Sequence, residues 1–296
     1  MQYLTEISAY QSEKRSAVTL GKFDCLHRGH QLLIDRVREL SDEDTCSIVC
    51  AFDMGKESLL TNEERRARLE GEVDCLIECP FTKELREMEA EQFIRRILVD
   101  TMHVKDVIIG TDFRFGYEVR GDAEMLQKYA GQYGYRVEVI EKKKYHEREI
   151  SSTYVRELLK EGNVKLASRL LGYTYCTSGT VEHGKRLGRT LGFPTMNVSW
   201  DGRKIAPRYG VYACETVIDG TVYPSIGNVG VKPTVAKIPQ LLAEVYVFGY
   251  EGDAYGKKIE IRFLDFERPE MRFDSVEELK HQVDIDLLYG RAYFNL

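Results

Sequence analysis

The stretch AVTLGKFDCLHRGH, residues 17–30, combines a short apolar strand, a turn and the beginning of a helix. Ala17 to Leu20 are typical of a buried strand, and an amphipathic helical pattern runs from Gln31 to Leu40. A glycine and two histidines spaced three residues apart lie between them. A strand that leads through such a turn into a helix is the opening unit of an α/β sheet.

The alternation of strand and helix continues through the first half of the chain. A helix opens at Thr61, where Glu64 completes a capping box. Strands are predicted at 47–52, 75–78, 106–109 and 135–140, and helices at 83–102, 123–130 and 154–171. Short apolar strands separated by amphipathic helices indicate a parallel sheet covered on both faces. We therefore expect a doubly wound α/β domain at 1–172, with its ligand at the carboxyl ends of the strands.

The pattern changes after Gly172. Strands at 211–218 and 221–226 flank Asp219-Gly220, which is a strong hairpin signal. Strands at 243–250 and 258–266 are predicted to form another pair around a glycine-containing turn, and 275–288 is helical. Several strands with short turns and one final helix predict a small antiparallel β-barrel domain with a terminal helix at 173–296.

Composition limits the functional classes. The 296 residues are 43% hydrophobic and 30% charged, with a formal net charge of −6, which opposes non-specific binding of nucleic acid. The sequence contains no apolar run of membrane-spanning length, and its first thirty residues are too charged for a secretory signal. The seven cysteines lack a C-x-x-C pair. A zinc site at the pairs 46/50 and 75/79 is the less favoured interpretation, and we expect these cysteines to be small buried hydrophobic residues in a reducing compartment. We expect a cytoplasmic protein without membrane or nucleic-acid partners.

The turn after the first strand has the chemistry of a phosphate site. A helix start offers backbone N–H groups and a positive dipole end. His27 and His30 can both face that point, and their N–H groups can stabilise charge at α- and β-phosphates. Gly29 allows a close backbone approach, while Gly21 and Phe23 begin the loop. The alternative is two ordinary polar residues in a loop, and the absence of G-x-G-x-x-G removes the main support for an NAD site.

Two further loops are expected at the same sheet edge. GTDFRFG, residues 110–116, follows the fourth strand and contains Asp112. SSTYVR, residues 151–156, starts a helix after the fifth strand and offers Ser152, Thr153 and Arg156 for phosphate. Ser152 alone fits an ordinary N-cap, and Arg156 alone fits a solvated helix residue. The prediction of a phosphate site therefore depends on three such loops meeting at one edge of the sheet.

These three loops, in this order, resemble the adenylyltransferase module of the prokaryotic bifunctional riboflavin kinase/FAD synthetases. The resemblance implies a Rossmann-like nucleotidyltransferase domain that transfers an adenylyl group from ATP to FMN, releases pyrophosphate and uses Mg²⁺. It also implies that His27 and His30 stabilise the transition state and that Arg156 holds phosphate. The chain departs from that family at Cys25, usually glycine, and at residues 52–56, which lack the usual histidine-proline pair.

The second half carries GTVEHGKRLGRTLGFPTMN, residues 179–197, and no Walker sequence. Glycines and basic residues here suit a polyphosphate, although such a run alone is typical of a solvated loop. Thr195 and Asn197 are two residues apart, so in an extended segment their oxygens face one side and can bind Mg²⁺. The predicted phosphate-binding residues of this segment are Gly184, Lys185, Arg189 and Gly192.

The same segment, with YGVY at 209–212, IGNVGVKPT at 226–234 and YGK at 255–257, resembles the riboflavin kinase domain. The resemblance implies that Glu244 is the catalytic base. Alternation places Glu244 on a strand face with Tyr246 and Phe248, where partial desolvation favours basicity. A primary hydroxyl that attacks a γ-phosphate needs such a proton acceptor. The family often has histidine at Tyr246.

Three hypotheses follow. The first is an enzyme that makes FMN from riboflavin and then FAD, with ATP as co-substrate and Mg²⁺; the second is a riboflavin kinase whose first domain no longer adenylylates FMN. The third is a flavin or nucleotide sensor without catalysis, which the presence of Thr195, Asn197 and Glu244 opposes. A nucleotidyltransferase of another pathway leaves the second half unexplained. The sequence leaves self-association open.

Overall fold

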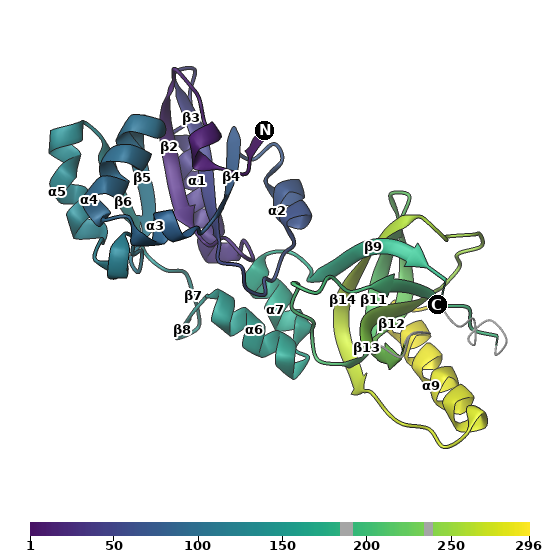
Figure 1. Cartoon of the computed structure of the whole chain (residues 1–296). Helices are drawn as coiled ribbons and strands as arrows, with labels where there is room; N and C mark the ends of the chain where they lie inside the picture. Colours follow the sequence, from purple (N-terminus) through teal and green to yellow (C-terminus); the bar gives the residue numbers. More distant parts are fainter. Residues whose placement is uncertain (184–191, 234–238) are drawn as a thin grey trace. The chain divides into compact units, whose positions relative to one another are not determined.

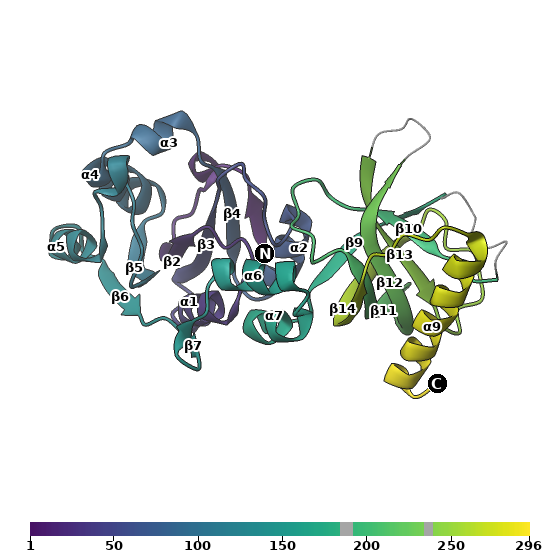
Figure 2. The same ribbon diagram turned by 90° about the horizontal axis from the view of Figure 1, so that it is seen from below.

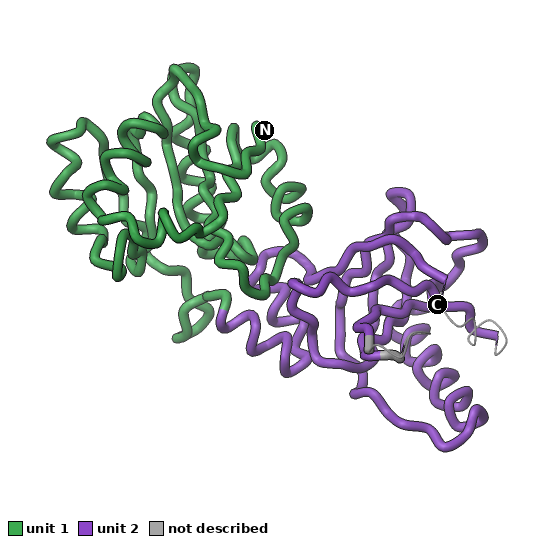
Figure 3. The backbone as a smooth tube through the Cα atoms, in the orientation of Figure 1, with its two compact units in different colours: residues 1–152 green, residues 153–296 purple. Residues whose placement is uncertain are grey.

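The computed structural model describes residues 1–183, 192–233 and 239–296. The chain divides into two compact units, Met1–Ser152 and Thr153–Leu296 (Figure 3).

The first unit contains a six-stranded sheet in the order β1-β4-β3-β2-β5-β6 (Figure 1). All of its neighbouring strands are parallel. The strands are β1 (Gln2–Leu4), β2 (Arg15–Gly21), β3 (Thr45–Asp53), β4 (Cys75–Pro80), β5 (Val104–Gly110) and β6 (Arg136–Ile140). The five predicted strands and the doubly wound architecture are confirmed, whereas β1 was not predicted. A separate two-stranded sheet, β7 (Lys144–Tyr145) and β8 (Arg148–Glu149), follows the main sheet.

Regular helices connect most of these strands. They are α1 (Arg28–Glu39), α2 (Asn62–Leu69) and α5 (Ala123–Tyr133), with short 3₁₀ turns η1 (Ile7–Ala9) and η3 (Tyr117–Val119). Thr61 and Glu64 form the predicted capping box at the start of α2. The single helix predicted at 83–102 is wrong: the segment is α3 (Lys83–Glu87), α4 (Ala90–Gln92) and the π-helix η2 (Phe93–Thr101). Met88 has extended backbone angles, and both Met88 and Ala90 are buried, a spacing of two that one helix places on different faces.

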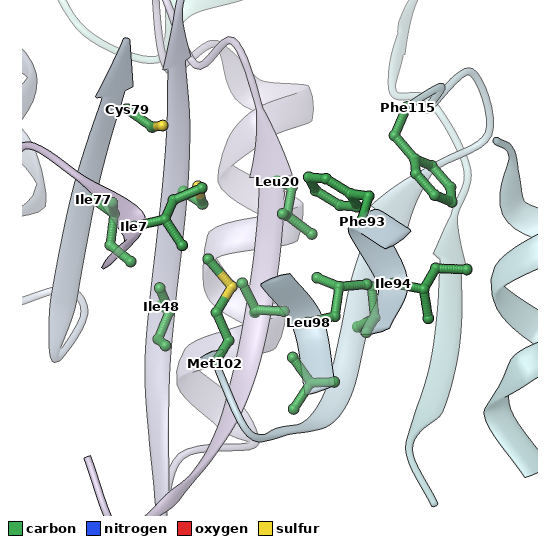
Figure 4. Packing of buried hydrophobic residues seen from close by; sticks show 14 of the residues in the cluster. Ile7, Leu20, Ile48, Ile77, Cys79, Phe93, Ile94, Leu98, Met102 and Phe115 are labelled. Carbon is green, nitrogen blue, oxygen red and sulfur yellow. The ribbon is translucent and has the colours of Figure 1, made fainter. Parts of the chain in front are cut away.

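The core of the first unit lies against the sheet (Figure 4). Phe93, Ile94 and Leu98 of η2 share one cluster with Leu20, Ile48 and Ile77 of the strands. Helix α1 contacts β2, β3 and β5, and the whole run from 16 to 20 in β2 is buried. The sheet is therefore covered on both faces, as the apolar strands predict.

Cysteines are part of this core. Cys50, Cys75 and Cys79 are buried free thiols in the cluster, as the small-hydrophobe interpretation predicts, and Cys46 is half-buried. Burial raises the pKa of the Cys75 thiol to about 12 and that of Cys50 well above its ordinary value. These thiols are therefore held protonated, as packing groups require.

The second unit is a closed antiparallel barrel in the order β10-β13-β12-β11-β14-β9. Its strands are β9 (Cys176–Glu182), β10 (Met196–Ser199), β11 (Gly210–Ile218), β12 (Thr221–Pro233), β13 (Pro239–Val247) and β14 (Lys258–Pro269). Asp219 and Gly220 both have positive φ, so the predicted hairpin of β11 and β12 is confirmed. The predicted pairing of β13 with β14 is wrong. β14 pairs along β11 and with β9 instead, because the ten-residue connection after β13 is long enough to cross the barrel.

In the described part of the second unit, three helices accompany the barrel. The predicted helix 154–171 is broken into α6 (Ser152–Glu161) and α7 (Val164–Leu171), because Gly162 takes a φ of 86° and Asn163 caps α7. Helix α7 contacts β14. The final helix α9 (Val276–Phe294) is the helix predicted at 275–288; it is capped by the Ser275 side chain, is longer than expected, and packs beside β11 and β12 of the barrel (Figure 2).

Candidate active sites

The first site lies at the switch point of the parallel sheet. From β2 the chain first continues to β3 and β4 on one side, and later to β5 and β6 on the other. The loops after β2 and β5 therefore border one crevice at the carboxyl ends of the strands. A third loop joins them, because the Ser152 hydroxyl donates to Oδ1 of Asp24 over 2.6 Å.

His27 caps helix α1. Its Nδ1 accepts the backbone N–H groups of Gly29 and His30, each over 3.1 Å. A Cβ atom on residue 29 would lie 3.1 Å from Cε1 of His27. Gly29 thus makes room for the imidazole of His27, and these two N–H groups bind the side chain of His27 in place of the phosphate expected from the sequence.

The two predicted histidines are together. Their rings stack with centroids 3.7 Å apart and planes 6° apart. Burial lowers the pKa of His27, and burial, repulsion from a protonated His27 and the positive charge of Arg65 lower that of His30 well below its ordinary value. Both rings are therefore neutral at pH 7. Because Nδ1 of His27 accepts, the proton of its neutral ring is on Nε2, which leaves that N–H as a donor.

A buried ion pair supports this loop. Nε of Arg65, in α2, donates to the carbonyl of Phe23 over 2.9 Å, and Nη1 of Arg65 pairs with Glu78 of β4. Arg65 and Glu78 are 4% and 3% exposed, and Tyr3 donates to Glu78 over 2.6 Å. Phe23 has a φ of 43°, so the guanidinium fixes a strained backbone next to His30, whose ring centroid lies 4.9 Å from that of Phe23. The sequence analysis missed this pair, although a glutamate inside the apolar strand 75–80 was a signal for it.

The remaining predicted residues of this site are dispersed along its loops. Asp112 follows β5 and pairs with Lys142 over 2.9 Å, and Gly21 ends β2. Thr153 and Arg156 lie in α6, across the division between the two units, so their part in this site stays a prediction. In the segment that lacks the histidine-proline pair, the N–H of Gly55 donates to the Asp53 carboxylate over 2.8 Å, which closes the loop on itself.

The second site is a cavity of ≈ 970 Å³ in the barrel unit. Its wall carries a row of polar side chains on adjacent strands, because Asn197 pairs with Glu182 and Glu244 across the ladder and Glu244 pairs with Asn228. Residues directly opposite each other in an antiparallel ladder point to the same face. Two predicted residues, Asn197 and Glu244, are thereby brought together, and the row adds Glu182 and Asn228, which the sequence analysis did not select.

The predicted oxygen ligands border the same cavity. Thr195 lines it immediately before β10, and Asn197 is only 8% exposed. A hydroxyl and an amide oxygen beside a carboxylate are hard donors that fit Mg²⁺. Gly192 has a φ of 90°, while the predicted Gly184, Lys185 and Arg189 lie outside the described residues. His183 and Tyr255 also line the cavity, with ring centroids 3.8 Å apart.

Helix α9 closes another side of this cavity through an ion pair between a half-buried arginine and a buried aspartate. Arg268 of β14 donates to both carboxylate oxygens of Asp286 over 2.7 and 2.6 Å, and Gln282 adds a third donor over 2.9 Å. Arg268 and Asp286 both line the cavity. Glu267 precedes this arginine, and its Oε2 is buried without a hydrogen-bond partner. Burial, and next the charge of Asp286, raise the pKa of Glu267 to about 7.

Curated relatives match the chain along its whole length. It is 36% identical to the bifunctional riboflavin kinase/FMN adenylyltransferase of Pseudomonas fluorescens, covering 99% of this chain and 97% of the relative. The chain belongs to this family. The enzyme of the same name from Haemophilus influenzae is 35% identical, with 94% of each chain covered. A family profile described as FAD synthetase matches residues 9–154 of this chain, and a profile described as riboflavin kinase matches residues 171–294.

A solved structure has the same fold as this chain over nearly its whole length. The crystal structure of a protein named a macrolide-efflux protein, from Streptococcus pneumoniae, has a TM-score of 0.86 and 29% identity, with 98% of each chain covered. Among the residues that the structure describes, every helix is too short or too polar to cross a membrane.

Both activities of the family are therefore assigned to this chain: riboflavin kinase and FMN adenylyltransferase, with a nucleotide co-substrate. The hypotheses of a sensor and of an unrelated nucleotidyltransferase are set aside. The predicted domain boundary at residue 172 stays a prediction, because residues 155–170 lie between the two matched segments.

Proposed function

We propose that the polar row of the barrel cavity phosphorylates riboflavin and that the switch-point loops adenylylate the FMN so formed. In the first step Glu244 accepts the proton of the 5′-hydroxyl as its oxygen attacks the γ-phosphorus of ATP. The new O–P bond forms as the bond to the β,γ-bridging oxygen breaks, and ADP leaves with the electron pair. The observation that carries this proposal is the direct cross-strand pairing of Glu244 with Asn197 at the cavity wall.

Thr195 and Asn197 would hold Mg²⁺ at this site. The donor chemistry fits, since both offer uncharged oxygens and leave coordination positions for phosphate and water. The cation would neutralise charge on the β- and γ-phosphates. Gly184, Lys185, Arg189 and Gly192 are proposed to bind the polyphosphate.

In the second step a phosphate oxygen of FMN attacks the α-phosphorus of ATP and pyrophosphate leaves. Nε2–H of His27, an N–H of His30 and the guanidinium of Arg156 are proposed to stabilise the charge that develops. Gly21, Phe23, Gly29, Asp112, Ser152 and Thr153 shape the nucleotide site around them. Such a reaction needs positioning and charge stabilisation and no covalent intermediate with the enzyme. Mg²⁺ is the proposed metal of this step too.

The assignment of the base is tested by replacing Glu244 with glutamine. Glu244→Gln keeps the shape of the side chain and removes the proton acceptor, so FMN formation should fall by about 10²- to 10⁴-fold. Binding of a non-hydrolysable ATP analogue, measured by calorimetry, should stay within about threefold of the wild type, because the nucleotide is held by other residues. Wild-type kinase turnover in this variant would rule out Glu244 as the base.

We propose that the protein works in the cytoplasm. All seven cysteines are free thiols, which fits a reducing compartment such as the cytoplasm. The net charge of −6 gives no support to a nucleic-acid partner.

A further inference from the structure

Three metal-binding side chains converge at the start of helix α1. The Sγ atom of Cys25 and one ring nitrogen each of His27 and His30 all lie within 4.8 Å of one another. Cys25 and His27 are buried and His30 is half-buried. The proposed adenylyltransferase uses the two imidazoles and gives the thiol no role.

The state of each donor atom can be worked out from its contacts. Sγ of Cys25 lies 3.3 Å from the hydroxyl oxygen of Ser152. Because Ser152 donates its only hydroxyl proton to Asp24, the thiol is the donor in that contact. Nδ1 of His30 is buried and has no hydrogen-bond partner. A buried ring nitrogen without a partner needs an explanation, and a bound ion is one.

The combination of donors selects the kind of ion. One thiolate and two imidazoles are soft to borderline ligands, which favour Zn²⁺ over the hard cation Mg²⁺. Zinc bonds of about 2.0–2.3 Å place tetrahedral ligand atoms roughly 3.3–3.8 Å apart, so the three side chains need to close by about 1 Å. Three protein ligands leave the fourth position open to water or phosphate.

We propose that Cys25, His27 and His30 form a binding site for Zn²⁺ or a similar thiophilic divalent cation. On binding, the Cys25 thiol releases its proton to solvent and its sulfur bonds to the metal. His27 binds through Nε2 once its ring proton has moved to Nδ1, which ends the two cap hydrogen bonds. The occupied site lacks the Nε2–H donor for phosphate, so the metal inhibits FMN adenylylation. This last consequence rests on the proposed function, whereas metal binding does not.

Cobalt provides a direct readout of the ligand set, because a thiolate bound to Co²⁺ gives a charge-transfer band in the near ultraviolet. Full-length protein, kept reduced with a phosphine and free of nucleotide, is titrated with Co²⁺ and then with Zn²⁺. We expect one equivalent of Co²⁺ to give the band and Zn²⁺ to abolish it. Cys25→Ser and Cys25→Ala should lose the band and weaken Zn²⁺ binding at least roughly 10-fold. Cys46→Ser, which removes a half-buried thiol elsewhere in the same unit, is the matched control and should keep both. A wild-type protein without the band, or Cys25 variants that retain it, would overturn the site.

Inhibition is measured separately with FMN, MgATP and increasing Zn²⁺. The FAD formation rate of the wild type should fall as the site fills, while that of Cys25→Ser, relative to its own metal-free rate, should resist. FMN formation from riboflavin at the same Zn²⁺ concentrations is the internal control. Uninhibited FAD formation by protein that shows the Cys25-dependent band would overturn the inhibitory role. Absence of FAD formation without any zinc would instead contradict the proposed function and leave the cobalt result intact.

Discussion

His27 illustrates how one side chain serves both local structure and chemistry. Its Nδ1 caps helix α1 and its Nε2–H is the proposed phosphate donor. Asparagine keeps a capping oxygen without the imidazole, whereas alanine removes both. We predict that His27→Asn and His27→Ala both lose FAD formation by about 10²-fold or more. Thermal unfolding should separate them, because only His27→Ala loses a cap worth about 1 kcal/mol. Wild-type FAD formation in His27→Asn would contradict the donor role.

The buried pair of Arg65 and Glu78 gives a second prediction at the residue scale. Arg65→Met leaves a carboxylate buried without its charge partner, which should destabilise the first unit by about 3–5 kcal/mol. Replacing both residues, in Arg65→Met/Glu78→Leu, removes the unpaired charge and should recover much of that loss. Urea unfolding followed by circular dichroism measures both variants. A double variant no more stable than the single one would show that the ion pair is not the source of the effect.

At this scale the sequence predicted the residues that belong to contiguous motifs. His27, His30 and Asn197 were selected from the spacing of their motifs and Glu244 from the family resemblance, and the structure brings each pair together. Arg65, Glu182 and Asn228 were missed because their position depends on pairing between strands and helices that are distant in sequence. A local sequence pattern does not specify the register between two strands, so it cannot show which side chains lie opposite each other in the barrel.

At the scale of elements, the contact of helix α9 with the barrel should depend on pH. Burial and the charge of the nearby Asp286, opposed by Arg268, raise the pKa of Glu267 in the folded state from 4.5 to about 7. Tyr289 of α9 is a further titratable neighbour of this carboxyl group. Because the folded state holds the proton of Glu267 more tightly than the unfolded state does, the protonated carboxyl group stabilises the fold, fully so below pH 4.5. This contribution to stability is lost as the pH rises through about 7.

Glu267→Gln should therefore flatten the pH dependence of stability. Between pH 5 and 8 the unfolding temperature of the wild type should fall more than that of the glutamine variant, which stays neutral throughout. Asp265→Asn, on the same strand, is a control that removes a carboxylate paired with Lys165 over 2.6 Å. Equal slopes for wild type and Glu267→Gln would show that this carboxyl is not protonated in the folded state.

Most elements could be predicted from periodicity, and the failures have physical causes. The predicted helix 154–171 ignored Gly162, whose positive φ ends α6. The predicted helix 83–102 ignored the buried pair Met88 and Ala90, which a single helix cannot place on one face. The predicted pairing of β13 with β14 assumed that sequence neighbours pair, whereas closure of the barrel requires β14 to lie between β11 and β9.

At the scale of the whole molecule, His27 and His30 lie in the first compact unit and Glu244 and Asn197 in the second, so the two activities should be separable by single substitutions. Glu244→Gln should still convert supplied FMN to FAD, and His27→Asn should still convert riboflavin to FMN. Chromatographic assays with riboflavin or FMN as substrate measure each step alone. A variant that loses both activities while its unfolding curve matches the wild type would show that the two sites depend on each other.

The order and type of the domains could be read from the change of pattern near Gly172, because alternating strands and helices give way to hairpin signals. The position of α6 and α7 could not, since an amphipathic helix can pack on either neighbour. In the structure they belong to the barrel unit, and α7 contacts β14.

The most direct test of the two activities is a time course of the purified protein with riboflavin, ATP and Mg²⁺, with riboflavin, FMN and FAD separated by chromatography. We predict that FMN appears first and is then converted to FAD by the same protein. If the reaction stops at FMN, and added FMN with fresh ATP gives no FAD, the adenylyltransferase role of the His27 and His30 site is contradicted.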